Sequence, residues 1–374
     1  MLDPVGFIIF YISVFIFLSV CLFFSIKVRV NSPIFFTIVF ITLMTLLAGL
    51  RSQNIGSDTY TFYNLTKSMV QSDSYLWAKD YFYYFVARLG FEISGFQGYV
   101  FLPSLVTSSS LGVAIYRIVH LSFILTPSRS KIMNETVCLL IIFILIMSSS
   151  DFLMQIVNQT RQVMAFSIFL LAYSFYIERK YIIFLSLMII AIFSHHSLFM
   201  VLLSMLLTIF IKDSRVYMIF IFISFFLFLT GISTQLLNAL GLGVSEDSIY
   251  AHALNSVTSL YIKTAITLFF GVLCFLFWNG DSKNKISTGL LNIYLTLASI
   301  AILYLNFGEG SNRIQRYEGV LFPLIFILLA RKKKINALHF VVIAFLSLSY
   351  VFFMMSYSST LLTLGFYTQG MKAL

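Results

Sequence analysis

The sequence predicts an all-α polytopic membrane protein with about twelve transmembrane helices, or roughly ten to thirteen depending on how short apolar segments are counted. Of its 374 residues, 60% are hydrophobic and 10% are charged, whereas a soluble domain carries about 25% charged residues. The apolar residues form long runs that short polar segments separate. A water-soluble fold could not bury this much apolar surface, so we expect a single integral-membrane domain over residues 1–374.

Apolar runs place the expected helices along the chain. The first run is too long for the apolar core of a signal peptide, so we expect it to remain as a helix. Several of the others are shorter than the roughly 20 residues that a transmembrane helix usually needs. The expected spans are residues 5–26, 33–50, 97–119, 136–153, 162–177, 181–195, 197–211, 216–232, 261–279, 287–305, 318–330 and 338–356. Cys21, Cys138 and Cys274 lie in apolar runs and predict free thiols.

Basic residues predict which loops face the cytoplasm. The net charge of +10 is therefore a topology signal and no indication of nucleic-acid binding. Residues 79–94 are expected to lie at the interface, because another crossing there would export the basic run at 331–334. Both termini then lie outside. The short loops on the cytoplasmic side hold Lys27, Arg29, Arg117, Arg129, Lys131, Arg179, Lys180, Lys212, Arg215, Lys283, Lys285, Arg331, Lys332, Lys333 and Lys334.

Four arginines at the outer ends of expected spans do not follow this topology rule. They are Arg51, Arg161, Arg313 and Arg316. Snorkelling toward lipid headgroups would explain any one of them. Four together, beside other polar groups, suggest an anion-binding site, because a guanidinium stays charged and offers paired N–H donors to phosphate oxygens.

The apolar run 181–211 is broken only by the sequence SHHS at residues 194–197. We expect a hairpin with its bend at His195 and His196, because one long helix would reverse the sidedness of everything after it. Each arm would then have about 15 residues and a length of about 22 Å, less than the roughly 30 Å of the hydrocarbon core. The two histidines are therefore expected to line a recess that opens outward, although buried hydrogen-bonding histidines would also fit.

These polar groups suit chemistry on a lipid pyrophosphate. Arginines can stabilise the charge that develops on a leaving diphosphate, and a histidine or an aspartate can accept a proton from an attacking hydroxyl. The stretch GLRSQNIGSDTYTFY at residues 49–63 contributes Arg51, Gly56, Asp58 and Tyr60. Neither a DxD pair nor an HExxH motif is present, and adjacent histidines are not at metal-ligand spacing. We therefore expect no metal and no other cofactor.

Three blocks, in order, resemble the Wzy-type bacterial polysaccharide polymerases, specifically the EpsG-like branch. Arg51, Gly56, Asp58 and Tyr60 or Tyr63 match the first block. The second block is matched by Arg161 and Gln162 and then by Phe193, His195, His196 and Ser197. Arg313 and Tyr317 match the third, and the resemblance covers residues 47–330.

The resemblance implies a lipid-phosphate-dependent membrane glycosyltransferase with a GT-C-like architecture. Such enzymes join undecaprenyl-pyrophosphate-linked oligosaccharide repeat units at the outer face of the cytoplasmic (inner) membrane. It implies inversion without a metal, and a chain-length regulator as a further partner besides the bilayer. The product could be lipopolysaccharide O-antigen, capsule or exopolysaccharide.

Roles for the matched residues follow as hypotheses. Arg161, Arg313 and Arg316 would hold the donor pyrophosphate, and His196, His195 or Asp58 would be the general base. Arg51 would orient Asp58 or contact the second pyrophosphate, and Gly56 would let the loop turn tightly. Gln162, Tyr60 and Tyr317 would contact the substrate, with the outer loops at about 51–96, 233–260 and 306–317 lining the site.

Two other functions stay open at this stage. A flippase or exporter of lipid-linked oligosaccharide would also need many spans and intramembrane arginines, although transporters often carry internal repeats and none is visible here. An O-antigen ligase would use similar chemistry to move finished polymer onto a lipid A core.

Overall fold

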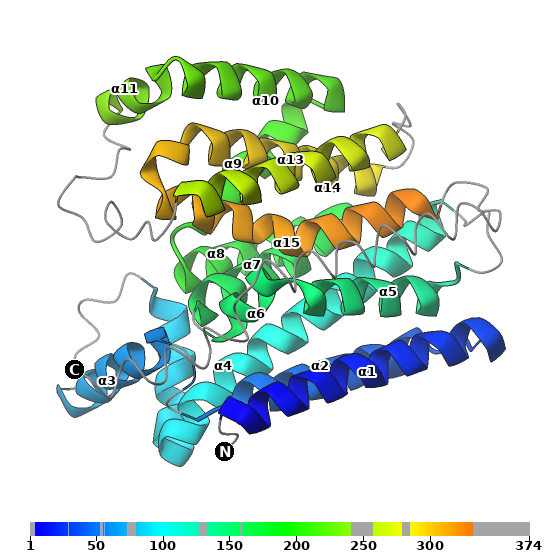
Figure 1. The fold of residues 1–374 in the computed structure, drawn as a ribbon. Helices are drawn as coiled ribbons and strands as arrows, with labels where there is room; N and C mark the ends of the chain where they lie inside the picture. The colour runs from blue at the N-terminus through cyan, green and yellow to red at the C-terminus, as the bar shows by residue number, and fades with distance from the viewer. Residues whose placement is uncertain are drawn as a thin grey trace. The chain divides into compact units, whose positions relative to one another are not determined.

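The computed structural model describes residues 4–28, 30–52, 55, 57–72, 80–126, 133–157, 159–240, 257–278 and 285–331 (Figure 1). Within these ranges the regular secondary structure is helical, which confirms the predicted all-α class. The chain forms two compact units. The first contains Met1–Leu198 together with Arg331–Leu374, and the second contains Phe199–Ala330.

The first unit is organised around one long, broken helix, α4. Helix α4 packs against α2, α7 and α8, while α7 also packs against α8 and α1 packs against α5. Cys21 and Cys138, both in this unit, are free thiols, as predicted, and so is Cys274 in the second unit. The helices of the first unit are α1 (Pro4–Val28), α2 (Pro33–Gly49), α3 (Ser57–Ser72), α4 (Tyr81–Leu125), α5 (Glu135–Ser148), α6 (Ser150–Val157), α7 (Thr160–Ile177) and α8 (Tyr181–Ser194).

The second unit is built around α14, which packs against α10, α13 and α15. Polar side chains tie these helices together: the Ser214 hydroxyl donates to Asn292 Oδ1 at 2.6 Å, and Gln315 Nε2 donates to Thr264 Oγ1 at 2.6 Å. Its elements are α9 (Leu198–Phe210), α10 (Ser214–Leu229), α11 (Ile232–Ala239), α13 (Val257–Trp278), α14 (Lys285–Leu303), the short 3-10 helix η1 (Leu305–Phe307) and α15 (Glu309–Ala330).

Each expected span between residues 5 and 330 overlaps a helix, so the predicted helical segments are confirmed there. The last expected span, 338–356, lies outside the described residues. By length and composition, four helices in the described part could cross a membrane, or up to five if α10 and α11, bent by 95°, form one span. Several other apolar helices have only 10–17 residues. Twelve crossings therefore remain a prediction.

Helix α4 contains a sharp break that separates the segment expected at the interface from the rest of the helix. The backbone leaves helical geometry at Ser94 and at Gly95, where φ is +60°. A Cβ atom on Gly98 would lie 1.9 Å from the carbonyl oxygen of Gly90, and one on Gly90 would lie 2.1 Å from that of Gly98. In a straight helix these residues would be about 12 Å apart. The two glycines therefore allow the first arm of α4 to fold back on the second.

The run 181–211 is interrupted where the sequence predicts. Helix α8 ends at Ser194, and His195 adopts extended backbone with φ −164° and ψ 122°. Helical structure resumes at Leu198. The SHHS sequence is thus a helix break, and the two adjacent histidines lie at the end of α8 rather than inside a helix.

Candidate active site

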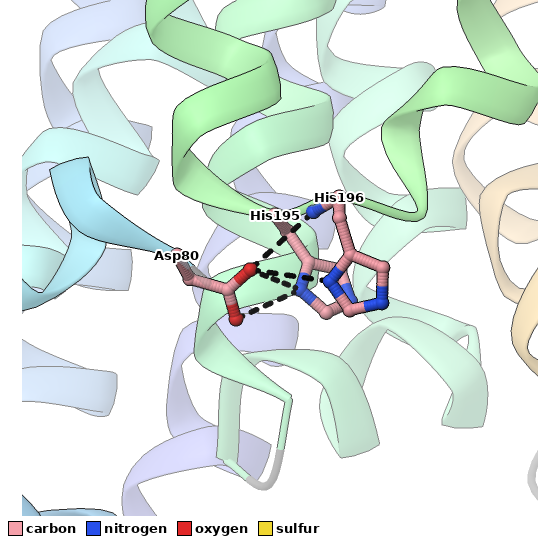
Figure 2. Close-up of side chains that lie close together, drawn as sticks. All are labelled: Asp80, His195 and His196. Carbon is pink, nitrogen blue, oxygen red and sulfur yellow. Dashed lines mark hydrogen bonds and ion pairs between the residues drawn. The ribbon is translucent and has the colours of Figure 1, made fainter. Parts of the chain in front are cut away.

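A buried carboxylate, Asp80, contacts the side chains of Arg161 and of the adjacent His195 and His196, which come from two distant parts of the sequence. Arg161 Nη1 donates to Asp80 Oδ2 at 2.6 Å. His195 Nδ1 lies 3.2 Å from each carboxylate oxygen, and His196 Nδ1 lies 3.4 Å from Oδ1 (Figure 2). The backbone N–H of His196 also donates to Oδ1, at 3.3 Å. Asp80 is therefore the centre of a cluster formed by Asp80, Arg161, His195 and His196, called here the Asp80 cluster.

Helix ends position the members of the Asp80 cluster. Asp80 is the N-cap residue of α4, Arg161 lies in the first turn of α7, and the histidines directly follow α8. Two helix N-termini therefore meet at the cluster, and each carries a partial positive charge that favours anions. An aspartate at an N-cap usually accepts hydrogen bonds from its own helix, yet Asp80 makes no side-chain cap. Its oxygens are used for the cluster instead.

Arg161 lies in the first turn of α7, where a positive charge is unfavourable unless a nearby anion compensates it. Positive charge in the first turn of a helix opposes the helix dipole. Asp80 supplies the compensating charge, and the guanidinium lies 3.8 Å from the centre of the Phe62 ring. The Arg161 side chain is 24% exposed, whereas that of Asp80 is 1% exposed. The guanidinium is thus fixed by its neighbours and still partly exposed at the protein surface.

The charge states of the cluster follow from its geometry. Burial raises the pKa of Asp80, but the hydrogen bonds from His195 and His196 and the charge of Arg161 outweigh it and bring that pKa below its usual range. Asp80 is therefore ionised near pH 7. Because a carboxylate only accepts, the Nδ1 atoms facing it carry the protons, which leaves Nε2 as the acceptor atom.

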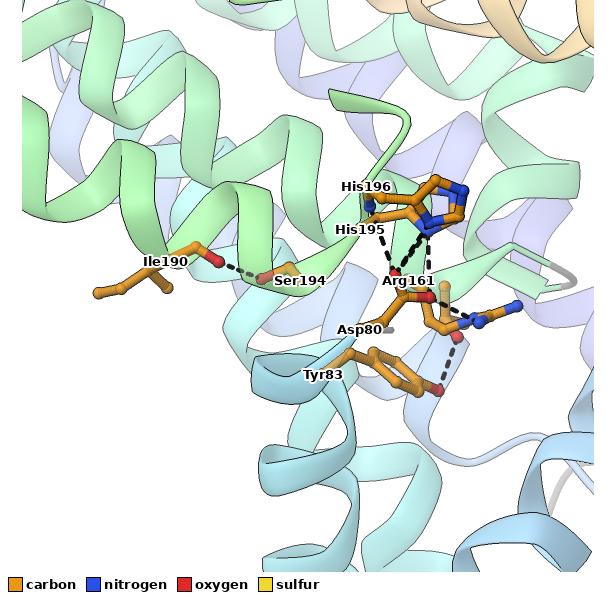
Figure 3. Close-up of polar contacts among 8 residues, drawn as sticks. Asp80, Tyr83, Arg161, Ile190, Ser194, His195 and His196 are labelled. Carbon is orange, nitrogen blue, oxygen red and sulfur yellow. Dashed lines mark hydrogen bonds and ion pairs between the residues drawn. The ribbon is translucent and has the colours of Figure 1, made fainter. Parts of the chain in front are cut away.

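The two histidines differ in access. The side chain of His195 is 6% exposed and that of His196 is 63% exposed. Figure 3 shows Asp80 between Arg161 and the two imidazoles, with Tyr83 beside them. The Tyr83 hydroxyl lies 2.8 Å from the Thr160 hydroxyl, which links the starts of α4 and α7 a second time. Of the two imidazoles, that of His196 can meet a substrate without rearrangement.

A divalent cation is a second chemical use for the same groups. One donor atom from each of Asp80, His195 and His196 lies within 4.8 Å of the others, close enough to hold a metal ion. Carboxylate and imidazole are ordinary metal ligands. However, Asp80 already makes a 2.6 Å ion pair with Arg161, and a cation on the same carboxylate would be repelled by that guanidinium. The arrangement as it stands favours an anionic ligand over a metal ion.

Arg51 is buried and makes hydrogen bonds to backbone carbonyls. It is 2% exposed, and its Nη1 donates to the carbonyl oxygens of Ala48 at 2.7 Å and Ile156 at 3.2 Å. Its charge therefore faces backbone carbonyls at the end of α2 and in α6. The sequence suggested a contact with Asp58, whose side chain lies outside the described residues, although its backbone is in α3.

The remaining predicted site residues are distributed over both units. The Tyr60 backbone lies in α3, and Gly56 and the side chain of Tyr60 lie outside the described residues. Gln162 is buried in α7. In the second unit, Arg313, Arg316 and Tyr317 belong to α15, so the two arginines, three positions apart, share a helical face. Arg316 is 9% exposed and Tyr317 is 1% exposed.

Sequence reasoning brought Arg161 and the histidines forward but missed Asp80. The residue follows Lys79 in a segment that was interpreted only as an interfacial helix. A signal was available: Asp is a preferred N-cap residue, and here it precedes the aromatic-rich stretch YFYYF. That signal predicts a helix start, however, and the loss of the cap in favour of two histidines and an arginine is visible only in three dimensions.

Comparison with known proteins shows which family this chain belongs to. No curated protein and no solved structure was found to be similar to the chain. A family-level match covers residues 33–368, and thus includes the Asp80 cluster, α15 and most of both units. The chain belongs to the EpsG family, a Wzy-like family of polysaccharide polymerases.

Proposed function

We propose that this protein is a glycosyltransferase of the bacterial inner membrane that polymerises oligosaccharide repeat units carried on undecaprenyl pyrophosphate, with the site facing outward. The observation that supports this most is the Asp80 cluster, which joins a fixed, partly exposed guanidinium to an exposed imidazole. Family membership supports the polymerase activity. The lipid-linked donor, the inverting course and the absence of a metal requirement are parts of this proposal.

The reaction needs one bond to form and one to break. A hydroxyl oxygen of the acceptor sugar attacks the anomeric carbon of the donor, and the bond from that carbon to the diphosphate oxygen breaks. The bonding electron pair leaves with the diphosphate. Arg161 donates N–H groups to the oxygens on which this charge develops, and the positive end of α7 adds to the stabilisation. A single displacement of this kind inverts the anomeric configuration.

The proton of the attacking hydroxyl goes to His196 Nε2. Asp80 supports this step because it accepts from Nδ1 and so directs the free lone pair of the ring to Nε2. The same carboxylate stabilises the imidazolium that forms, as the aspartate of a Ser-His-Asp triad does. The buried His195 contacts both oxygens of the carboxylate and keeps it in place.

Asp80 also orients the Arg161 guanidinium and compensates its charge before the substrate binds. An arginine has five N–H donors in a planar fork, and the ion pair with Asp80 uses the Nη1 group. A diphosphate can bind the other side of the guanidinium, because the Arg161 side chain is 24% exposed. The carboxylate then orients the guanidinium for the substrate and prevents an uncompensated charge before the substrate arrives.

Purified protein mixed with lipid-linked repeat units tests the proposal. A ladder of products that differ by one repeat unit, formed equally with and without a chelator, is the expected result. A ladder that disappears with chelator and returns with a divalent cation would show instead that the reaction needs a metal, for which Asp80, His195 and His196 are candidate ligands. Gene deletion separates the alternatives: loss of a polymerase leaves single-unit glycolipid on the surface, loss of a flippase leaves none, and loss of a ligase leaves polymer on its carrier.

A further inference from the structure

An apolar groove begins directly beside the Asp80 cluster, within the first unit. It is an open groove of about 350 Å³, lined by Tyr81, Phe82, Phe85, Ile189, Ile190 and Phe193. The lining side chains come from the start of α4 and the end of α8, and those of Tyr81, Phe85 and Phe193 are 50%, 47% and 49% exposed. The groove is therefore an accessible surface and not part of the packed core.

We propose that this groove binds the first isoprene units of the lipid diphosphate donor, next to the carbon that bears the diphosphate. The inference rests on the proposed function for the identity of the anionic group. The inference specifies where the hydrocarbon chain of the donor lies, and therefore from which side the donor enters the site.

The register of the two helices connects the groove to the cluster. Residues 81, 82 and 85 form one face of α4, and residues 189, 190 and 193 form the equivalent face of α8. Tyr81 directly follows Asp80, and Phe193 lies two residues before His195. The Tyr81 and Phe193 rings are in edge contact, with centroids 6.2 Å apart. Both helix faces thus end at the charged groups, and Figure 3 shows Ile190 and Ser194 on the turn of α8 that leads to the histidines.

The close spacing of apolar and charged groups selects the kind of lipid. In a polyprenyl diphosphate the diphosphate is bonded directly to the first carbon of the chain, so the anion and the hydrocarbon must be bound side by side. A glycerophospholipid places a glycerol ester unit between its phosphate and its acyl chains. The groove begins at the residue after Asp80 and extends for one helical turn, about 6 Å along each helix. This fits a chain whose first atoms lie beside Arg161.

The composition of the groove supports the same ligand. Four of its six lining residues are aromatic, and rigid aromatic rings offer large apolar contact areas to a branched, unsaturated chain. The adjoining Asp80 cluster contains two positive groups that are complementary to a diphosphate, the Arg161 guanidinium, which is paired with Asp80, and the N-terminus of α7. A bulk bilayer lipid would satisfy the apolar part of this surface but not its charged end.

Binding of farnesyl diphosphate and of methyl diphosphate to the purified full-length protein tests the groove without requiring catalysis. Phe85→Ala/Phe193→Ala removes two exposed rings from the groove. Phe210→Ala/Phe222→Ala removes two rings that are 81% and 68% exposed and lie outside the groove, and serves as the matched control. We expect the groove variant to weaken farnesyl diphosphate binding about tenfold, to change methyl diphosphate binding less than about twofold, and the control variant to change neither.

Equal loss of both ligands, or no loss of either, in the groove variant would overturn the inference. So would equal competition by farnesol, because an uncharged prenol would then show a surface for any lipid. A groove variant that does not fold is replaced by the single variant Phe193→Ala, read in the same way. Failure of the product ladder with intact discrimination between the two ligands would reject the polymerase reaction and keep the groove. A product ladder formed by a protein that does not discriminate between the two ligands would support the polymerase reaction and reject the groove.

Discussion

Arg161 and Asp80, 81 residues apart in the sequence, form an ion pair of 2.6 Å that joins the first turn of α7 to the start of α4. The ion pair brings the guanidinium predicted from sequence to a carboxylate that sequence analysis did not identify. It is accessible from the side of Arg161 and buried on the side of Asp80. Binding of an anion and orientation of the histidines therefore depend on the same carboxylate.

Replacement of Arg161 by lysine should reduce polymerisation by about a hundredfold, because lysine keeps the charge but loses the planar two-point donor geometry. A matched control lies near the far end of α7, where Arg117 Nη2 donates to Glu178 Oε1 at 2.6 Å. Arg117→Lys should keep polymerisation within about twofold, as expected for a partly exposed ion pair. The rate of ladder formation per folded molecule measures both. Equal losses in the two variants would remove the special role of Arg161.

His196→Gln should lower the turnover rate by about a hundredfold or more, because the general base is lost. Added imidazole should restore part of the rate, since the His196 side chain is 63% exposed and its loss leaves an opening to solvent. His195→Gln provides the comparison: its side chain is 6% exposed, so imidazole should not rescue it. If imidazole rescued only the His195 variant, His195 would be the general base and His196 the residue that holds Asp80 in place.

Arg51 should act on folding rather than on chemistry. Its Nη1 bonds to the carbonyl oxygens of Ala48 and Ile156, and hydrogen bonds of this charged type contribute roughly 1.5–3 kcal/mol each. Arg51→Met should therefore lower the unfolding temperature and the amount of folded protein, while the ladder rate per folded molecule stays within about threefold. Normal stability combined with a large loss of rate would restore the substrate-binding role that the sequence suggested.

The apolar pattern of the sequence was sufficient to predict the apolar helices, because helix formation in an apolar solvent depends on local backbone hydrogen bonding. It did not predict the polar helix α3 (Ser57–Ser72), which lies in a stretch expected as an outer loop. The break at His195 and His196 followed from the predicted topology, since one uninterrupted helix would have reversed the sidedness of the loops after it. The fold-back of α4 did not follow, because it depends on the close approach of Gly90 and Gly98. Two glycines at this spacing in a single sequence do not by themselves predict that a helix folds back.

The candidate site was predictable only in part, for a related reason. Arg161 was noticed because its charge contradicts the topology rule, and His195 and His196 because they interrupt an apolar run. Asp80 lies among other polar residues and looks like an ordinary helix start. The contrast between Arg51, on backbone carbonyls, and Arg161, on a carboxylate, also needed coordinates, since both arginines follow the same sequence pattern.

The most direct measurement of the role of the Asp80 cluster is the rate of ladder formation by Asp80→Asn in purified form, with wild-type protein measured alongside. The amide is nearly the same size as the carboxylate, but it cannot neutralise Arg161 or accept from both imidazoles as an anion. We predict a loss of about a hundredfold or more in rate, with the protein still folded and inserted in the membrane. A ladder formed by Asp80→Asn at the wild-type rate would contradict the role proposed for this cluster.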